Sequence, residues 1–350
     1  SHHDEAPADV DYQKSKLSLR NSLCRDELTV MRQDVLGGCG FLGRHVARQL
    51  LANGKTVRVV DLSHCRSEVP GLEPPECITL DLLTATAADF DAIVAGADIV
   101  HHYAWTTIPQ TANLDPQADL HANLGTTIGL LEAMRRSGGG RMVFSSSGGT
   151  VYGKLQTIPV PETHPLAPIT AYGASKVSAE TYLNFYRDLY GIDTRIARVA
   201  NPFGAGQHPA RPQGLATTVV HHALSGTPIE IWGDGLVVRD FIHINDVTAG
   251  LICLAEAPAQ DLRTRMIYNI GSGRGASVNE IITSVERHVG HALTIDRKPG
   301  RPFDVPVSVL DITAAKTDLD WSPALSLDEG VWRMISDLRE RPERAFSSLG

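Results

Sequence analysis

From Val35 onward, short β-branched runs alternate with longer stretches of helical periodicity. Four of the runs predict buried strands, at residues 56–60, 97–101, 141–145 and 194–199. Helices are predicted at residues 44–53, 119–137 and 171–190. Because alternating strands and helices pack as a parallel sheet covered on both faces, the sequence predicts an α/β, doubly wound fold.

The alternation ends after Asn201, where a segment rich in proline and glycine predicts a long loop. We therefore expect residues 35–200 to form a first domain, to which a segment around 240–270 returns. Residues 201–350 are expected to form mainly a smaller α/β domain that covers a substrate. Residues 1–34 are a mostly polar N-terminal extension without an assigned role. The leucines from Leu17 to Leu28 fit one docked helix about as well as disorder.

Composition argues against several classes of function. The formal net charge of −8 disfavours a nucleic-acid-binding surface, which needs a dense basic patch. No apolar run reaches the roughly 18 residues of a membrane span, and the N-terminus lacks the apolar stretch of a secretory signal. Adjacent histidines point to different faces of a strand or helix, so their three pairs predict no metal site. The cysteines are odd in number and lack Cys-x-x-Cys spacing, which predicts reduced thiols and a cytoplasmic protein; they are Cys24, Cys39, Cys65, Cys77 and Cys253.

A glycine-rich loop precedes the first predicted helix. Gly37, Gly40 and Gly43 recur at three-residue spacing, which permits a tight turn and lets the backbone approach a pyrophosphate at the helix N-terminus. Asp61 ends the next predicted strand, 18 residues beyond Gly43, where a carboxylate binds ribose hydroxyls and repels a 2′-phosphate. This pattern predicts NAD rather than NADP as cofactor. The alternative is a glycine turn with an unrelated aspartate, and the strand before Gly37 offers only two apolar residues.

Tyr172 and Lys176 are four residues apart near the start of a predicted helix, so their side chains share one face. A phenol has a pKa near 10, and an adjacent ammonium favours the phenolate that a general base requires. The run from Ser145 to Ser147 ends a predicted strand, at the edge where parallel sheets bind ligands. A hydroxyl there would hydrogen-bond a reacting oxygen. The alternatives are a structural Tyr–Lys pair and a polar strand end.

Together these motifs resemble the extended short-chain dehydrogenase/reductase superfamily. The likeness covers roughly residues 35–335 and includes the glycine loop, Asp61, Asn123-Leu-Gly-Thr126, the serine run, Val151-Tyr-Gly153 and Tyr172-x-x-x-Lys176. Within it, the sequence resembles the NAD-dependent epimerase/dehydratase family, in particular UDP-glucose and UDP-N-acetylglucosamine 4-epimerases. The resemblance implies a Rossmann domain, bound NAD, a UDP-sugar substrate and a homodimer formed by the helices at 119–137 and 171–190.

The resemblance also implies roles for individual residues. The catalytic residues would be Ser147, Tyr172 and Lys176. On the substrate side, Asn201, Arg239 and Arg301 would bind the diphosphate, Asp304 a ribose hydroxyl and Trp232 the base, while Ser308 would stand beside the C2 substituent of the sugar. The cofactor would contact Gly37, Gly40, Phe41, Leu42, Gly43, Asp61, Asp81, Leu82, Tyr103, Ala104, Asn123, Tyr172 and Lys176.

The sequence departs from the family pattern in its serine loop. The family usually has two residues between the catalytic Ser/Thr and Val-Tyr-Gly, whereas Gly148-Gly-Thr150 makes three. Counting back from Tyr152 selects Gly148, while counting back 25 residues from Tyr172 selects Ser147. We assign the role to Ser147. A second departure is Thr107, which stands where some 4-epimerases carry a lysine near the pyrophosphate.

The favoured reaction is 4-epimerisation of a UDP-hexose, UDP-glucose/galactose or the N-acetylated pair, through a transient 4-keto sugar. A UDP-uronic acid epimerase and a nucleotide-sugar reductase share every feature above and remain alternatives. Dehydration is disfavoured, because dehydratases of the family carry Asp or Glu just after the catalytic Ser/Thr, where this chain has Gly148 and Gly149. A catalytically silent binding protein is disfavoured by the intact Ser, Tyr and Lys set.

Overall fold

The computed structural model describes residues 31–340, except for 64–70, 208–213, 263–265 and 301–304. The predicted N-terminal helix, Cys24, Cys65, Arg301 and Asp304 therefore lie outside the described residues. Of the helices in the described part, none is long and apolar enough to cross a membrane.

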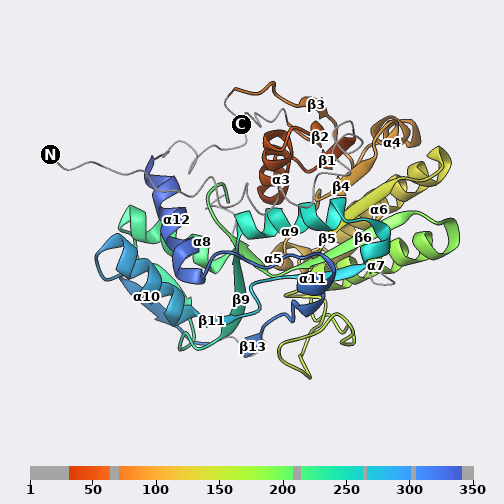
Figure 1. Ribbon diagram of the computed structural model, residues 1–350. Helices are drawn as coiled ribbons and strands as arrows, with labels where there is room; N and C mark the ends of the chain where they lie inside the picture. The colour runs from red at the N-terminus through yellow and green to blue at the C-terminus, as the bar shows by residue number, and fades with distance from the viewer. Residues whose placement is uncertain (1–30, 64–70, 208–213, 263–265, 301–304, 341–350) are drawn as a thin grey trace.

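The centre of the molecule is a parallel sheet of seven strands in the order β10-β6-β5-β4-β1-β2-β3 (Figure 1). The predicted doubly wound α/β fold is confirmed. The reversal of strand order at β1 and β4 creates the crevice in which such sheets bind ligands. The strands are β1 (Arg32–Leu36), β2 (Thr56–Asp61), β3 (Glu76–Thr79), β4 (Ile99–His102), β5 (Arg141–Ser147), β6 (Asp193–Val199) and β10 (Ile267–Ile270).

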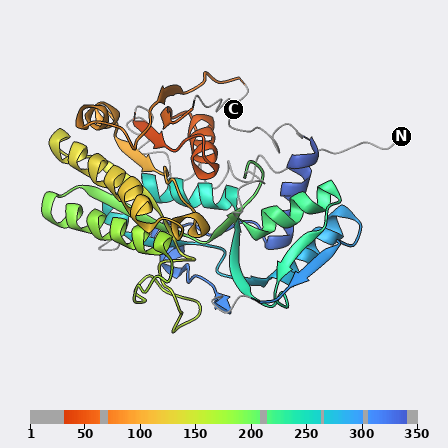
Figure 2. The ribbon, with the colours of Figure 1, turned by 180° about the vertical axis from the view of Figure 1, so that it is seen from behind.

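Helices cover both faces of this sheet, as Figure 2 shows from behind. Successive strand residues face opposite sides, so Val143 packs in one core with α3 and α9, and Phe144 in the other with α4, α6 and α7. The three predicted helices correspond to α3, α6 and α7, whose ends lie within three residues of the predicted ones. The helices of this domain are α3 (Phe41–Ala52), α4 (Ala87–Val94), α5 (Pro109–Ala112), α6 (Pro116–Ser137), α7 (Ala171–Tyr190), α9 (Ile244–Glu256) and α11 (Thr313–Asp318), with the short 3-10 helix η1 (Ala259–Leu262).

Strand β1 is unusual because it buries polar side chains. Gln33 and Asp34 are 1% and 0% exposed. The Asp34 carboxylate accepts hydrogen bonds from Nε of Arg58 (3.0 Å) and Nε of Arg32 (3.1 Å), while Gln33 Oε1 lies 2.7 Å from Nε2 of His101. The strand therefore begins at Arg32, before the expected boundary at residue 35, because paired charges replace the apolar residues of an ordinary buried strand.

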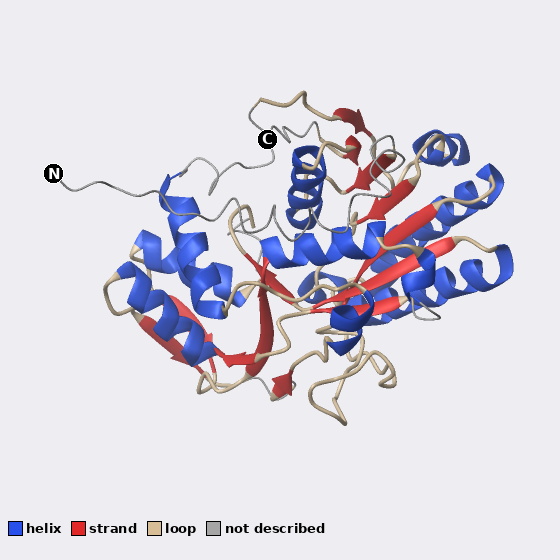
Figure 3. Ribbon diagram, viewed as in Figure 1, coloured by secondary structure: helices blue, strands red, loops and turns tan. Residues whose placement is uncertain are grey.

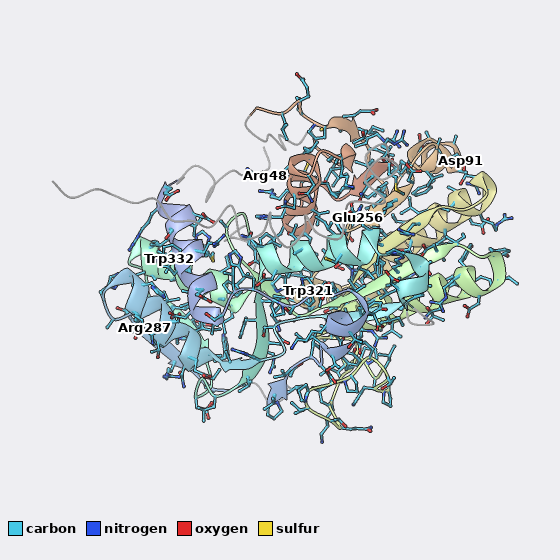
Figure 4. The ribbon with its side chains drawn as sticks, viewed as in Figure 1. Arg48, Asp91, Glu256, Arg287, Trp321 and Trp332 are labelled. Atoms are coloured by element: carbon cyan, nitrogen blue, oxygen red, sulfur yellow. The ribbon has the colours of Figure 1, made fainter. Side chains whose placement is uncertain are left out.

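The second half of the chain builds a smaller α/β layer beside the sheet (Figure 3). Its core includes Phe203, Val220 and Met334. Strand β10 pairs with β6 at the edge of the main sheet, and Trp321 packs against α9 (Figure 4). The elements of the smaller layer are β7 (Asn201–Phe203), α8 (Leu215–Ser225), β8 (Ile229–Trp232), β9 (Val238–His243), β11 (Gly275–Ser277), α10 (Val278–Val289), β12 (Ile295–Lys298), β13 (Val307–Ser308) and α12 (Leu327–Glu340).

Candidate active site

The loop between β1 and α3 brings backbone atoms unusually close together. Gly37 has φ +77°, and a Cβ there would lie 2.7 Å from the nitrogen of Ala104. A Cβ on Gly43 would lie 2.1 Å from the Gly37 carbonyl oxygen. Side chains are therefore excluded from this turn, which leaves the backbone and the N-terminus of α3 accessible to a phosphate group. This geometry fits the pyrophosphate of a dinucleotide.

Asp61 ends β2 directly beside this loop. Its Oδ2 accepts a hydrogen bond from the backbone nitrogen of Cys39 (2.8 Å), and its Oδ1 accepts one from Leu62 (2.7 Å). The predicted adenine-side residues Asp81 and Leu82 follow β3 at the same sheet edge. The carboxylate is thus fixed at the edge where the ribose of a dinucleotide would lie.

Tyr103 and Ala104 follow β4 and form the opposite wall of the glycine loop. The backbone nitrogen of Tyr103 donates to the Leu36 carbonyl at 3.0 Å, and its hydroxyl lies 2.8 Å from Nδ1 of His101. Asn123 of α6 holds the adjacent segment, because its Oδ1 accepts from the nitrogen of Thr106 at 2.9 Å. The fold therefore brings Tyr103, Ala104 and the segment held by Asn123 together beside the glycine loop.

The prediction of reduced thiols is wrong at Cys39, which is disulfide-bonded. Cys77 and Cys253 are free, and burial raises the pKa of the Cys253 thiol to about 11. Spacing along the chain could not reveal the disulfide, because a disulfide requires proximity in the fold and not a Cys-x-x-Cys motif.

Tyr172 lies in the first turn of α7, whose N-cap is Thr170. The Thr170 hydroxyl accepts a hydrogen bond from the backbone nitrogen of Gly173 at 3.1 Å. Lys176 follows one turn later, and its Nζ donates to the Ser145 carbonyl at 2.6 Å and lies 5.6 Å from the centre of the Tyr172 ring. The predicted face shared by the tyrosine and the lysine is present and meets the end of β5.

The Tyr172 hydroxyl and the Ser147 hydroxyl have no hydrogen-bond partner within the described part of the chain. Burial raises the pKa of the Tyr172 phenol, and the Asp119 carboxylate raises it further. Burial lowers the pKa of the Lys176 ammonium, while Glu180 and Asp119 oppose that shift. Burial therefore favours the neutral phenol, and formation of the phenolate needs positive charge, to which the N-terminus of α7 contributes.

Gly148 is packed against the protein. A Cβ at this position would lie 2.6 Å from Cδ1 of Leu310 and 3.1 Å from the carbonyl oxygen of Arg198. A serine or threonine at this position would require the Leu310 side chain to move, so the close packing fits the glycine that the sequence has. The nitrogens of Thr150 and Val151 both donate to the Ser147 carbonyl at 3.2 Å, forming a turn that accommodates the extra residue.

Two polar networks surround the Tyr–Lys pair and were not predicted. In the first, the buried carboxylate of Asp119 accepts hydrogen bonds from Ser175 (2.5 Å), Asn123 (2.9 Å) and Thr107. It thereby ties α7 to α6 and to the segment after β4. Its position four residues before Asn123 places it on the same helix face, which is the only signal the sequence offered.

In the second network, Glu180 and Arg198 form an ion pair whose side chains are 2% and 3% exposed. Arg198 Nη2 donates to Glu180 Oε2 at 2.6 Å, and the Ser146 hydroxyl donates to Oε1 at 2.5 Å. Arg198 Nη1 also donates to the Tyr152 hydroxyl at 3.0 Å. The pair fixes β5, β6 and α7 behind the serine run.

The predicted substrate residues lie mainly on β7, β9 and β13. The Asn201 amide donates to the Asp240 carbonyl at 2.9 Å, and Arg239 Nη1 donates to the carbonyls of Val238 and Val305 at 2.9 and 2.6 Å. Through these hydrogen bonds, Asn201 connects β7 to β9, and Arg239 connects β9 to the segment before β13. Trp232 is 43% exposed at the end of β8.

Ser308 is 8% exposed and stands opposite Arg239 in the pairing of β13 with β9. Ser308 is therefore largely shielded from solvent.

Known proteins share both the sequence and the fold. The NAD dependent epimerase/dehydratase family matches residues 35–271. The chain is 32% identical over 318 residues to the UDP-glucose 4-epimerase of Mycolicibacterium smegmatis, covering 89% of this chain and 100% of that protein. It is 29% identical over 311 residues to the dTDP-4-dehydro-6-deoxyglucose reductase of Escherichia coli, covering 87% and 96%. The crystal structure of the Thermotoga maritima UDP-glucose 4-epimerase with UDP-glucose superposes with a TM-score of 0.81 at 31% identity, covering 89% and 100%. The resemblance found in the motifs is thus confirmed, and the chain belongs to the NAD dependent epimerase/dehydratase family.

Proposed function

We propose that this NAD-dependent enzyme interconverts UDP-hexoses by 4-epimerisation. The observation that carries the proposal is the position of Lys176, whose Nζ lies 5.6 Å from the centre of the Tyr172 ring and donates to the carbonyl of Ser145, on the strand that ends at Ser147. The hydroxyls of Tyr172 and Ser147 have no hydrogen-bond partner among the described residues. A carboxylate for the expulsion of water is missing at positions 148 and 149, which are both glycine. Epimerisation needs only an acid–base pair and a hydride carrier, so this set of groups suffices.

NAD⁺, when bound, supplies a hydride acceptor for C4 of the sugar and later returns the hydride. In the proposed reaction, the Tyr172 phenolate removes the proton of the 4-hydroxyl, and Ser147 donates a hydrogen bond to the same oxygen. The 4-keto sugar then turns about its phosphate linkage, and Tyr172 returns the proton after reduction on the other face. Lys176 stabilises the phenolate throughout, because an adjacent cation favours the charged form of a phenol.

The similarity to two UDP-glucose 4-epimerases supports UDP as the nucleotide. We assign the diphosphate to Asn201, Arg239 and Arg301, since the planar guanidinium group donates two parallel hydrogen bonds to phosphate. Trp232 is assigned to the base and Asp304 to a ribose hydroxyl; like Arg301, Asp304 lies outside the described residues. The burial of Ser308 supports its assignment as the wall beside the C2 substituent.

The similarity to a dTDP-4-dehydro-6-deoxyglucose reductase favours a second candidate, net reduction of a 4-keto nucleotide sugar. The same Tyr172 would then donate a proton to O4 while hydride is delivered once. A reductase consumes one reduced cofactor for each product formed, whereas an epimerase consumes none. Cofactor stoichiometry therefore separates the two reactions.

The helices α6 and α7 are proposed to pair across a two-fold axis into a homodimer. Helix α7 exposes several large apolar side chains, a type that is usually buried: Tyr182 is 37%, Phe185 44%, Leu189 60% and Tyr190 45% exposed. The Phe185 ring contacts the rings of Tyr182 and Tyr190 edge to face, with ring centres 6.3 Å and 5.9 Å apart. A contiguous apolar patch of this kind marks an interaction surface.

The proposed reaction is tested by incubating the protein with NAD and a panel of UDP-hexoses and identifying the products by NMR. Formation of the 4-epimer without net change in reduced cofactor is expected. Products only from a 4-keto sugar, with stoichiometric oxidation of NADH, would replace the proposal with the reductase.

A further inference from the structure

The Lys176 ammonium lies in an enclosure made largely of aromatic rings. The residue is 3% exposed, and the one hydrogen bond that its Nζ donates among the described residues goes to the Ser145 carbonyl. Nζ lies 3.6 Å from the centre of the Trp105 ring, 4.7 Å from that of Phe144 and 5.6 Å from that of Tyr172. An ammonium this close to the face of an indole is attracted by the negative potential of the ring.

Trp105 is positioned by its neighbours in the site. It follows β4 directly after Tyr103 and Ala104, the residues that wall the glycine loop. Its ring lies edge-on to Tyr172, with ring centres 6.2 Å apart, and 5.7 Å from Phe144. Its indole Nε1 is buried and has no hydrogen-bond partner in the described chain. Ring contacts, and no hydrogen bond, therefore hold the indole between Lys176 and Tyr172.

The charged groups that face Lys176 are already engaged elsewhere. Glu180 of α7 is paired with Arg198, and Asp119 of α6 accepts three side-chain hydrogen bonds. His102 of β4 is neutral, because burial, together with the charge of Lys176, lowers its pKa to about 3. Neither carboxylate is within the 4.0 Å of an ion pair with Lys176, so the Trp105 face is a closer source of stabilisation for the ammonium.

We propose that Trp105 is a positioning residue, whose indole face holds the Lys176 side chain as an ammonium beside Tyr172. The inference deepens the proposed function, in which Lys176 stabilises the phenolate of Tyr172. Replacing the indole by an aliphatic side chain would weaken the preference for the ammonium and raise the pH at which Tyr172 ionises. A cation–π contact in a desolvated site corresponds to a shift of about one pH unit.

The test measures the ionisation of Tyr172 directly, in protein saturated with NAD. Near-ultraviolet tyrosinate absorbance is titrated for the wild type, Trp105→Leu and Trp105→Phe, each against the same protein carrying Tyr172→Phe. Trp105→Leu should raise the midpoint by about one unit, and Trp105→Phe by less, since a phenyl face attracts cations more weakly than an indole. Trp332→Leu, at a 53% exposed tryptophan on α12 (Figure 4), is the matched control and should leave the midpoint unchanged.

Epimerase kinetics supply a second readout. For Trp105→Leu, kcat should fall near neutral pH and recover at alkaline pH, with KM changed by less than about twofold. An unshifted midpoint in both Trp105 variants, or a loss of kcat that is equal at every pH, overturns the proposal. The titration decides the role of Trp105 even if no UDP-hexose is epimerised. Failure of the proposed function can therefore be distinguished from failure of the proposal for Trp105. If Trp105→Leu does not fold, the test rests on Trp105→Phe, whose Tyr172 midpoint must still rise by the smaller amount; an unshifted midpoint in that variant overturns the proposal.

Discussion

Replacing Glu180 by alanine would leave the guanidinium of Arg198 buried without its counter-charge. In the native protein, Arg198 donates to Glu180 through Nε at 3.1 Å and through Nη2 at 2.6 Å. After the substitution, Nη1 retains the Tyr152 hydroxyl and the Glu162 carbonyl, both at 3.0 Å. Two of the five guanidinium hydrogens, together with the Ser146 hydroxyl, would lose their acceptors.

Removing one partner of a buried ion pair typically costs about 3–5 kcal/mol, because an uncompensated charge remains in a desolvated site. At about 2–4 °C per kcal/mol for a domain of this size, Tm should fall by about 6–20 °C. Asp91→Ala is the matched control, since it removes the partner of Arg136 at the surface of α4, where the two side chains are 49% and 38% exposed (Figure 4). That substitution should cost about 0–1 kcal/mol, because solvent screens the pair.

Urea denaturation followed by circular dichroism measures the free energy of unfolding of both variants. The double variant Glu180→Leu with Arg198→Met should recover most of the loss, since it removes both charges from the core. A Glu180→Ala protein within about 1 kcal/mol of the wild type would refute the reasoning. A double variant no more stable than Glu180→Ala would show that packing, and not the unpaired charge, accounts for the loss.

Four further predictions concern the cofactor, the base, the sugar and the assembly. Calorimetric titration should show NAD binding more tightly than NADP, because the Asp61 carboxylate repels a 2′-phosphate; equal affinities would contradict this role. Tyr172→Phe should lower kcat at least 100-fold or so with folding unchanged, and Ser147→Ala should also be slow, as expected for loss of acid–base groups; near-normal turnover of either variant would remove its residue from the mechanism. UDP-N-acetylglucosamine should be epimerised at a rate comparable with UDP-glucose, and Ser308→Tyr should suppress the acetylated substrate selectively, because overpacking costs about 1–3 kcal/mol; equal effects on kcat/KM for both sugars would show that Ser308 is not the gate. Light scattering should give about twice the 37.8 kDa of one chain, and a monomer at micromolar concentration would contradict the α6–α7 interface.

Most of the fold was predictable from local patterns. Periodicity located the strands at 56–60, 141–145 and 194–199 to within two residues, because burial on both faces demands continuous apolar runs. The same rule failed at β1, whose Asp34 is stabilised by arginines on two strands. A charged side chain can replace an apolar one in a core only when an oppositely charged side chain lies beside it. Which strands will lie side by side, and so which charges will pair, cannot be read from the apolar pattern of one segment.

The sequence by itself determined the glycine loop, Asp61, the Tyr172 and Lys176 spacing and the serine run, since each depends on residues close together in the chain. Only the tertiary structure revealed the close packing around Gly148, because it comes from Leu310, 162 residues away. The burial of Ser308, the disulfide at Cys39 and the contact of Trp105 with Lys176 were decided in the same way. Each depends on segments that meet only after the strands have paired and the helices have packed, so no local pattern carries the information.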